Sequence, residues 1–226
     1  MTWVIPADLE EAMYAAARAV VGDERLATSA LTRAVVDRSK RYTSDRDRLA
    51  APADPRADLA ARAAFFTIAD AIKIAIPLGE LAGRDALPAR RPLRIVDLGA
   101  GCGAMSLGAI ASIDAAIEVV AIDRDVEALR IADLALRDFA SRRGAAVSVT
   151  TQANDVASAS IPRADLVVLG TVLNELPAAQ RLPLVLRALA AIEGDGAVII
   201  IEPALRETSR ALHELRDAVL AGSHAT

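Results

Sequence analysis

The hydrophobic pattern of the chain changes character near residue 93. Before that point, apolar residues recur at helical spacing and predict helices over residues 8–22, 23–42 and 57–76. A polar, proline-containing stretch, TSDRDRLAAPADPRAD, separates the second helix from the third and is typical of a loop. We therefore expect residues 1–90 to form a helical N-terminal region that acts as a cap or docking surface.

From residue 93 onward, short β-branched runs alternate with helical patterns. Such continuous apolar strands, separated by helices, are typical of a parallel sheet that is covered on both faces. Right-handed crossovers then favour a doubly wound α/β fold, and we predict a Rossmann-like domain over residues 91–226. The predicted strands are 93–98, 117–123, 146–151, 164–170 and 196–202, and the predicted helices are 103–113, 125–142, 178–192 and 208–221.

Three glycines follow the first predicted strand, in the stretch IVDLGAGCGAMSLG. Ligands of doubly wound sheets bind outside the carboxyl ends of the strands, and glycines there let the backbone and its N–H groups approach a ligand. The G-x-G-x-x-G/A motif of dinucleotide-binding folds is matched by Gly99, Gly101 and Ala104. The motif of methyl-donor folds, an acid followed by G-x-G-x-G, is matched by Asp97 together with Gly99, Gly101 and Gly103.

The acid at Asp97 favours the methyl donor. A pyrophosphate is anionic and would be repelled by a carboxylate at the strand end, whereas S-adenosylmethionine (SAM) carries a sulfonium and an ammonium. Asp123 ends the second strand, where an acid can accept hydrogen bonds from ribose hydroxyls. Asn154 or Asp155 could bond the adenine amino group, although Asp155 is equally suited to capping a turn. The predicted cofactor-binding residues are Asp97, Gly99, Ala100, Gly101, Gly103, Asp123, Arg124, Asn154, Asp155 and Gly170.

The acceptor side of a methyltransferase is expected at the end of the fourth strand, which reads GTVLNEL here. Methyl transfer from SAM depends on alignment and on the exclusion of water more than on covalent help. We predict Asn174 and Glu175 as catalytic residues, although the same pair could simply begin the helix that contains Pro177. Glu202, at the end of the fifth strand, is a further candidate. The Asn/Asp-Pro-Pro-aromatic motif of many nucleic-acid amino-methyltransferases does not occur here, which argues against N-methylation of adenine or cytosine.

Composition and charge narrow the classes of partner. With a net charge of −4 and a pI near 5.3, the chain as a whole is not a basic nucleic-acid binder, and the basic residues between Arg33 and Arg48 fit a solvated helix face. The single cysteine, Cys102, excludes an intrachain disulfide and a cysteine-built metal site, and we predict no metal. The N-terminus does not have the pattern of a signal peptide, and no apolar run is long enough to span a bilayer. We expect a cytoplasmic protein without a membrane partner.

Three stretches of the chain resemble a known family. VDLGAGCGAMSLG, ADLVVLGTVLNEL and IIIEPALRETSRALHELRD are similar to the methyltransferase-like proteins associated with the small ribosomal subunit, the mitochondrial small-subunit assembly factors and their bacterial relatives. The resemblance covers about residues 55–220, and LNEL followed by EPALRETSR is its more specific part. It implies a class I methyltransferase sheet, mostly parallel and of strand order 3-2-1-4-5, that binds SAM through the glycine loop and Asp123. It also implies a role in small-subunit assembly or contact with rRNA.

The sequence departs from the pattern of this family in one large respect. Family members continue into a cysteine-containing segment implicated in binding an iron–sulfur cluster, and class I methyltransferases end in two further strands, whereas this sequence stops at Thr226. We therefore expect a shortened version whose fifth strand is an apolar edge. Three functions remain open, namely a SAM-dependent methyltransferase acting on the small subunit or its rRNA, an assembly factor that binds SAM without turnover, and a small-molecule methyltransferase. A nicotinamide oxidoreductase is the least favoured alternative.

Overall fold

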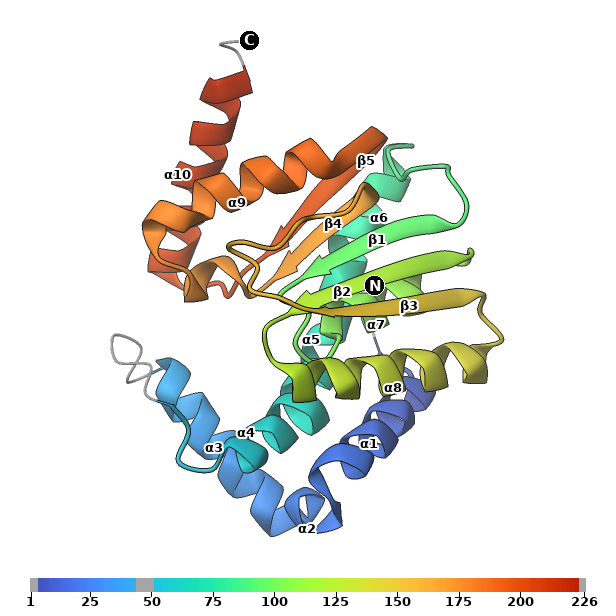
Figure 1. Ribbon diagram of the computed structural model, residues 1–226, viewed down its shortest axis with the longest axis vertical. Coiled ribbons are helices and arrows are strands. Elements are labelled where there is room, and N and C mark those ends of the chain that lie inside the picture. Colours follow the sequence, from blue (N-terminus) through green and yellow to red (C-terminus); the bar gives the residue numbers. More distant parts are fainter. Residues whose placement is uncertain (1–3, 44–50, 224–226) are drawn as a thin grey trace.

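Five parallel strands form the centre of the computed structural model, which describes residues 4–43 and 51–223 (Figure 1). The strands lie in the order β3-β2-β1-β4-β5, and all four neighbouring pairs are parallel. The predicted α/β class and strand order are therefore confirmed. The strands are β1 (Leu93–Leu98), β2 (Ile117–Asp123), β3 (Val147–Ala153), β4 (Ala164–Gly170) and β5 (Ile192–Ile201).

The central strands are apolar along their whole length because both of their faces are covered. Ile95 and Val168 point into a core on one face of the sheet, and Val96 and Val167 point into a second core on the other face. β5 begins at Ile192 rather than at the predicted residue 196, because the chain leaves the preceding helix directly into the strand and then bulges before it pairs again with β4. Among the described residues β5 is an edge of the sheet, as expected.

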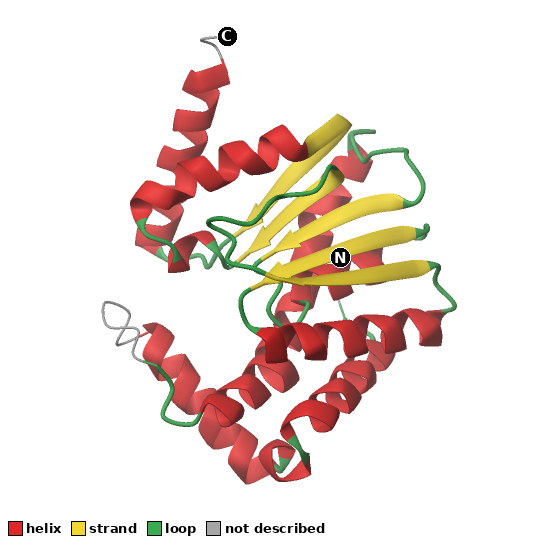
Figure 2. Ribbon diagram, in the orientation of Figure 1, coloured by secondary structure: helices red, strands yellow, loops and turns green. Residues whose placement is uncertain are grey.

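Helices cover both faces of the sheet (Figure 2). On one face lie α7 (Ala104–Ser112) and α8 (Val126–Arg143), which join consecutive strands of the β1-β2-β3 half. On the other face lie α9 (Ala178–Ala191) and α10 (Arg206–Ser223), together with part of the turn between β3 and β4. This leaves the carboxyl ends of the strands facing a space that the N-terminal region borders (Figure 1).

The N-terminal region is helical, as predicted, and packs on the same face as α7 and α8. Asp54 caps its longest helical segment by accepting hydrogen bonds from the N–H groups of Arg56 and Ala57, at 3.1 and 3.0 Å. The predicted third helix ended at residue 76, before Pro77, but the helical segment continues through Pro77 in α6 (Ala75–Gly83) to Gly83. The elements of the region are α1 (Ala7–Val21), α2 (Asp23–Leu26), α3 (Thr28–Thr43), α4 (Pro55–Ala61), the π-helix η2 (Arg62–Thr67), α5 (Ile68–Ala71), the 3₁₀ turn η3 (Ile72–Ile74) and α6 (Ala75–Gly83).

The N-terminal region lies very close to the helix that follows β1. A Cβ atom on Gly108 of α7 would lie 1.8 Å from the carbonyl oxygen of Ala71, so α5 can approach only because this position carries no side chain. This contact fixes η2, the segment just before α5, beside the glycine loop. The polar residues 44–50 of the predicted break lie outside the described residues. No helix in the described ranges is long and apolar enough to cross a membrane.

Candidate cofactor site

A cavity of about 660 Å³ lies at the carboxyl ends of β1, β2 and β4. Its walls are the glycine loop after β1, the turns after the other strands, and side chains from α3, α4 and η2. The structure therefore brings most of the predicted site residues together around one space. Those that line it are Asp97, Gly99, Ala100, Gly101, Asp123, Arg124, Asp155, Gly170 and Glu175.

Three predicted site residues, and also the further candidate Glu202, do not line this cavity. Gly103 instead allows close packing, because a Cβ there would lie 3.2 Å from the Cβ of Ala132 on α8. Asn154 is exposed, and its N–H donates to the carbonyl oxygen of Asp123 at 2.9 Å. Asn174 lines a second cavity on the far side of the 3₁₀ turn η4 (Leu173–Glu175).

Asp97 is a buried carboxylate at the inner end of the cavity and is only 1% exposed. Its Oδ2 accepts hydrogen bonds from the Ser106 N–H at 3.2 Å and the Ser106 hydroxyl at 2.6 Å. Its Oδ1 is buried and has no hydrogen-bond partner in the described structure. Burial raises the pKa of Asp97 to about 6, although the bonds from Ser106 act to lower it. A carboxylate held in this way is suited to a cationic ligand that supplies the missing donor.

The glycine loop is shaped by steric requirements. Gly99 has a φ of +72°, and a Cβ on it would lie 2.5 Å from Cγ2 of Val172. The N–H groups of Gly99 and Ala100 donate to the carbonyl oxygen of Ile122 at 2.7 and 3.1 Å. The expectation that the N–H groups of this loop face a ligand is thus wrong for these two residues. A pyrophosphate would lack those donors, which weakens the dinucleotide alternative.

Asp123 organises the loop from the end of β2. Its Oδ2 accepts the N–H of Gly101 at 2.8 Å, and its Oδ1 accepts the N–H of Asp125 at 2.8 Å. Each carboxylate oxygen can accept a second hydrogen bond, so the acid remains able to bind the hydroxyls of a ribose. Asp125 in turn caps α8 by accepting the N–H of Ala128 at 3.1 Å.

Arg62 is a cavity residue that sequence reasoning missed. It extends from η2 to Asp125, with Nη1 2.5 Å from Oδ2, and its Nη2 lies 3.4 Å from the position that a Cβ on Gly101 would occupy. The signal in the sequence is a single arginine inside the apolar stretch LAARAAFF. Its guanidinium is a cation placed at the cavity wall, next to the loop.

Thr171 is a second residue that the sequence did not indicate. It follows β4, lines the cavity and has a φ of +58°, a conformation that is strained for a β-branched residue. Its N–H donates to the carbonyl oxygen of Ile201 at 2.7 Å, and its hydroxyl donates to the Gly170 carbonyl at 2.7 Å. The strained turn therefore depends on pairing with β5, which no local pattern reveals.

The charge lining the cavity is negative on balance. Arg38 and Arg41 of α3 both pair with Asp58, Arg38 at 2.8 Å, so this part of α3 is not the solvated basic face expected from the sequence. Carboxylates outnumber guanidinium groups around the cavity, which favours a cationic ligand. The acids are Asp58, Asp70, Asp97, Asp123, Asp125, Asp155 and Glu175, and the bases are Arg38, Arg41, Arg62 and Arg124.

Neither thiol nor metal chemistry is indicated at this site. Burial raises the pKa of the Cys102 thiol to about 11, so the sulfur stays protonated at neutral pH, although the nearby Arg62 charge acts to lower that value. No group of three His, Cys, Asp or Glu side chains in residues 4–43 and 51–223 is placed to hold a metal ion.

A comparison with protein families decides the relationship. The model described as "Mitochondrial small ribosomal subunit Rsm22" matches residues 58–226, which is most of the chain. The chain belongs to the Rsm22 family. The resemblance drawn from the glycine loop and from the LNEL and EPALRETSR stretches is thereby confirmed. A comparison with curated proteins gave no match.

Several solved structures that are similar to this Rsm22 family member are described as methyltransferases. A proposed RNA methyltransferase of Pyrococcus horikoshii is 22% identical, with a TM-score of 0.43 over 65% of this chain and 66% of that one. A SAM-dependent methyltransferase of Leishmania major is 15% identical, with a TM-score of 0.47 over 75% of this chain and 59% of that one. The magnesium protoporphyrin IX methyltransferase of Synechocystis, solved with bound SAM, is 16% identical, with a TM-score of 0.42 over 71% of this chain and 72% of that one. This chain thus spans less than two thirds of the first two proteins.

Proposed function

We propose that this Rsm22 family member binds SAM in the cavity at the carboxyl ends of β1 and β2. The observation that carries the proposal is the buried Asp97 carboxylate, whose Oδ1 has no donor although it lies at a cavity. SAM brings an ammonium and a sulfonium, and such charges are stabilised by a carboxylate in a site of low dielectric. The excess of acids around the cavity supports the same ligand.

The cavity offers a partner for each polar part of SAM. We assign Asp97 to the positive charges, Arg62 to the methionine carboxylate and Asp123 to the ribose hydroxyls. Asp155 is the remaining candidate for the adenine, although its Oδ1 already accepts the N–H of Ala157 at 2.8 Å, as expected for a turn cap. When bound, SAM supplies an activated methyl group, so the protein has only to align the acceptor and exclude water.

Glu175 is the predicted catalytic residue that faces this cavity. It lies in η4, after the end of β4, and lines the same cavity as Arg38 and Arg62. From there its carboxylate can orient an acceptor or receive a proton from it. Asn174 lies on the other side of η4, so we do not assign it a contact with the methyl acceptor.

We propose the small ribosomal subunit, through its rRNA, as the site of action. The support is the family description, which links Rsm22 proteins to that subunit. The acidic balance of the cavity indicates that an acceptor base would enter it without its phosphates, as in enzymes that turn a base out of its stack. An assembly factor that binds SAM without turnover uses the same cavity, and only a transfer assay separates the two.

Two measurements test the proposal. Calorimetric titration with SAM and with its demethylated product should show binding that Asp97→Asn weakens by about tenfold or more. The matched control is Asp114→Asn, which removes an exposed carboxylate from the loop between α7 and β2. Tritium transfer from methyl-labelled SAM to small-subunit particles, to free rRNA and to small-molecule extracts then identifies the acceptor. Tight binding without transfer to any of them would leave only the non-catalytic factor, and no SAM binding would overturn the proposal.

A further inference from the structure

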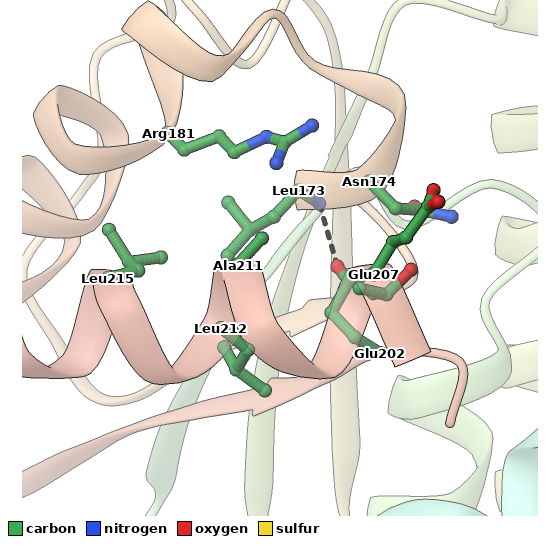
Figure 3. A pocket seen from close by; sticks show the side chains of 9 residues that line it. Leu173, Asn174, Arg181, Glu202, Glu207, Ala211, Leu212 and Leu215 are labelled. Carbon is green, nitrogen blue, oxygen red and sulfur yellow. Dashed lines mark hydrogen bonds between the residues drawn. The ribbon is translucent and has the colours of Figure 1, made fainter. Parts of the chain in front are cut away.

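A second cavity, of about 360 Å³, lies between η4, α9 and α10 (Figure 3). It is separated from the proposed SAM cavity by η4 itself, because Val172 and Glu175 line that cavity whereas Leu173 and Asn174 line this one. The nine lining residues are Leu173, Asn174, Arg181, Glu202, Glu207, Thr208, Ala211, Leu212 and Leu215.

Two buried acceptor atoms at this cavity have no donor. Oε1 of Glu202 accepts the N–H of Leu173 at 2.7 Å, as the dashed line in Figure 3 shows. The other oxygen, Oε2, is buried without a partner in the described structure, and so is Oδ1 of Asn174. Leaving a buried acceptor unpaired destabilises the folded protein. Both atoms would be satisfied by a ligand that brings N–H donors.

The charge around the cavity specifies the ligand further. Glu202 and Glu207 are acidic, and Arg181 is the only cation among the lining residues. The Nε of Arg181 donates to the carbonyl oxygen of Leu176 at 3.1 Å, so part of its guanidinium is already engaged. Burial raises the pKa of Glu202, even though the nearby N–H groups of Leu173, Asn174 and Val172 and the Arg181 charge act to lower it. A ligand with one positive charge would therefore neutralise the net negative charge of the residues that line the cavity.

The remaining walls indicate the shape of the ligand. Leu173, Leu212 and Leu215 provide aliphatic surface, and none of the nine lining residues is aromatic. A nucleobase would therefore find no side chain to stack on, whereas an alkyl chain would be covered. Figure 3 shows the polar side chains Asn174 and Glu207 gathered at one end of the cavity and Leu215 at the other.

We propose that this second cavity binds an alkylammonium or alkylguanidinium group. The N–H donors of that group satisfy Oε2 of Glu202 and Oδ1 of Asn174, and its alkyl chain lies against the leucines. The group belongs either to a free polyamine or to a lysine or arginine side chain of another protein. The proposal does not depend on SAM binding, because the two cavities share no lining residue.

Calorimetric titration of the full chain with four probes tests the proposal. Agmatine and putrescine represent free amines, N-acetyl-arginine methylamide represents a protein side chain, and N-butylurea is the uncharged counterpart of a butylguanidinium. We expect the cationic probes to bind and N-butylurea to bind about tenfold more weakly or not at all. Binding of the free amines alone assigns the site to polyamines, and equal binding of the arginine derivative assigns it to a protein side chain.

Matched variants locate the binding. Glu202→Gln keeps the acceptor for the Leu173 N–H but removes the negative charge. It should weaken the binding of agmatine by about tenfold. Glu214→Gln removes an exposed acid from α10, the helix that forms one wall of the cavity, and should change nothing. Ala211→Phe fills the cavity and leaves Glu202 intact, which keeps the test valid if the Glu202 variant does not fold.

Either of two results overturns the proposal. One is that no cationic probe binds the wild-type chain at millimolar concentration. The other is that Ala211→Phe and every folded Glu202 variant bind agmatine as the wild type does. A SAM titration of the same preparations shows separately whether the first cavity works, so failure of one site is not mistaken for failure of the other.

Discussion

Asp97→Asn should make the ligand-free protein more stable at neutral pH and at the same time weaken its affinity for SAM by about tenfold or more. The Asp97 carboxyl has its pKa raised from 3.8 to about 6, chiefly by burial. One pKa unit corresponds to about 1.4 kcal/mol, so the charged form of Asp97 costs the folded state roughly 3 kcal/mol. Asparagine has the same shape and retains an oxygen that can accept the bonds from Ser106, but it carries no charge.

The pH dependence of this effect follows from the sign of the shift. Below the unfolded pKa of 3.8, Asp97 is protonated in both states and costs nothing. As the pH rises to about 6, the unfolded chain releases this proton while the folded protein still holds it, so the wild type loses stability. Above that range the loss is constant. The difference in unfolding free energy between Asp97→Asn and the wild type should therefore rise by roughly 3 kcal/mol from about pH 4 to about pH 7.

Urea denaturation at a series of pH values measures this difference, and all other titrating groups cancel because both proteins share them. A given concentration of SAM should stabilise the wild type more than it stabilises the variant, since a ligand that binds the folded state stabilises it more when its affinity is higher. The reasoning is refuted if the variant is less stable than the wild type at neutral pH, or if the difference does not change with pH. Wild-type affinity of the variant for SAM would refute the assignment of Asp97 to the cofactor.

Three further substitutions test other parts of the structure. Gly99→Ala should lower stability by about 2 kcal/mol in urea denaturation, because the residue has a φ of +72° and its Cβ would lie 2.5 Å from Val172; an unchanged midpoint would contradict the loop geometry. Arg62→Gln should weaken the binding of SAM by about tenfold in calorimetry but leave the binding of 5′-methylthioadenosine unchanged, because that ligand has no carboxylate. Equal losses of affinity for both ligands would rule out the assigned contact. Asp165→Asn should cost about 3 kcal/mol in thermal unfolding, because Asp165 is buried and pairs with Arg94 at 2.7 Å; a wild-type midpoint would show that the pair contributes nothing.

The sequence predicted the sheet and the placement of Asp97 and Asp123 well, because both depend on local sequence patterns. Alternation of apolar strands with helices determines a parallel sheet, and in such a sheet the ends of neighbouring strands meet at one edge. Asp97 and Asp123 therefore had to lie near each other once β1 and β2 paired in register. The positive φ angles of the glycine loop are likewise a property of the residues themselves.

What the sequence did not reveal depends on contacts between distant segments. Arg62 reaches the site only because η2 is fixed beside α7, and Thr171 is strained only because β4 pairs with β5. Asn174 and Glu175 are adjacent in sequence, yet a 3₁₀ turn directs them to different cavities. The loop N–H groups were expected to face a ligand, but the Ile122 carbonyl lies within reach and takes two of them.

A single 3₁₀ turn, η4, separates the two cavities, and this has a consequence for regulation. Its Leu173 N–H is tied to Glu202 in the second cavity, while the preceding residue, Val172, touches the glycine loop in the first. A ligand that displaces η4 in one cavity therefore changes the shape of the other cavity. Thermodynamic linkage is reciprocal, so whatever factor an amine imposes on the affinity for SAM, SAM imposes on the affinity for the amine.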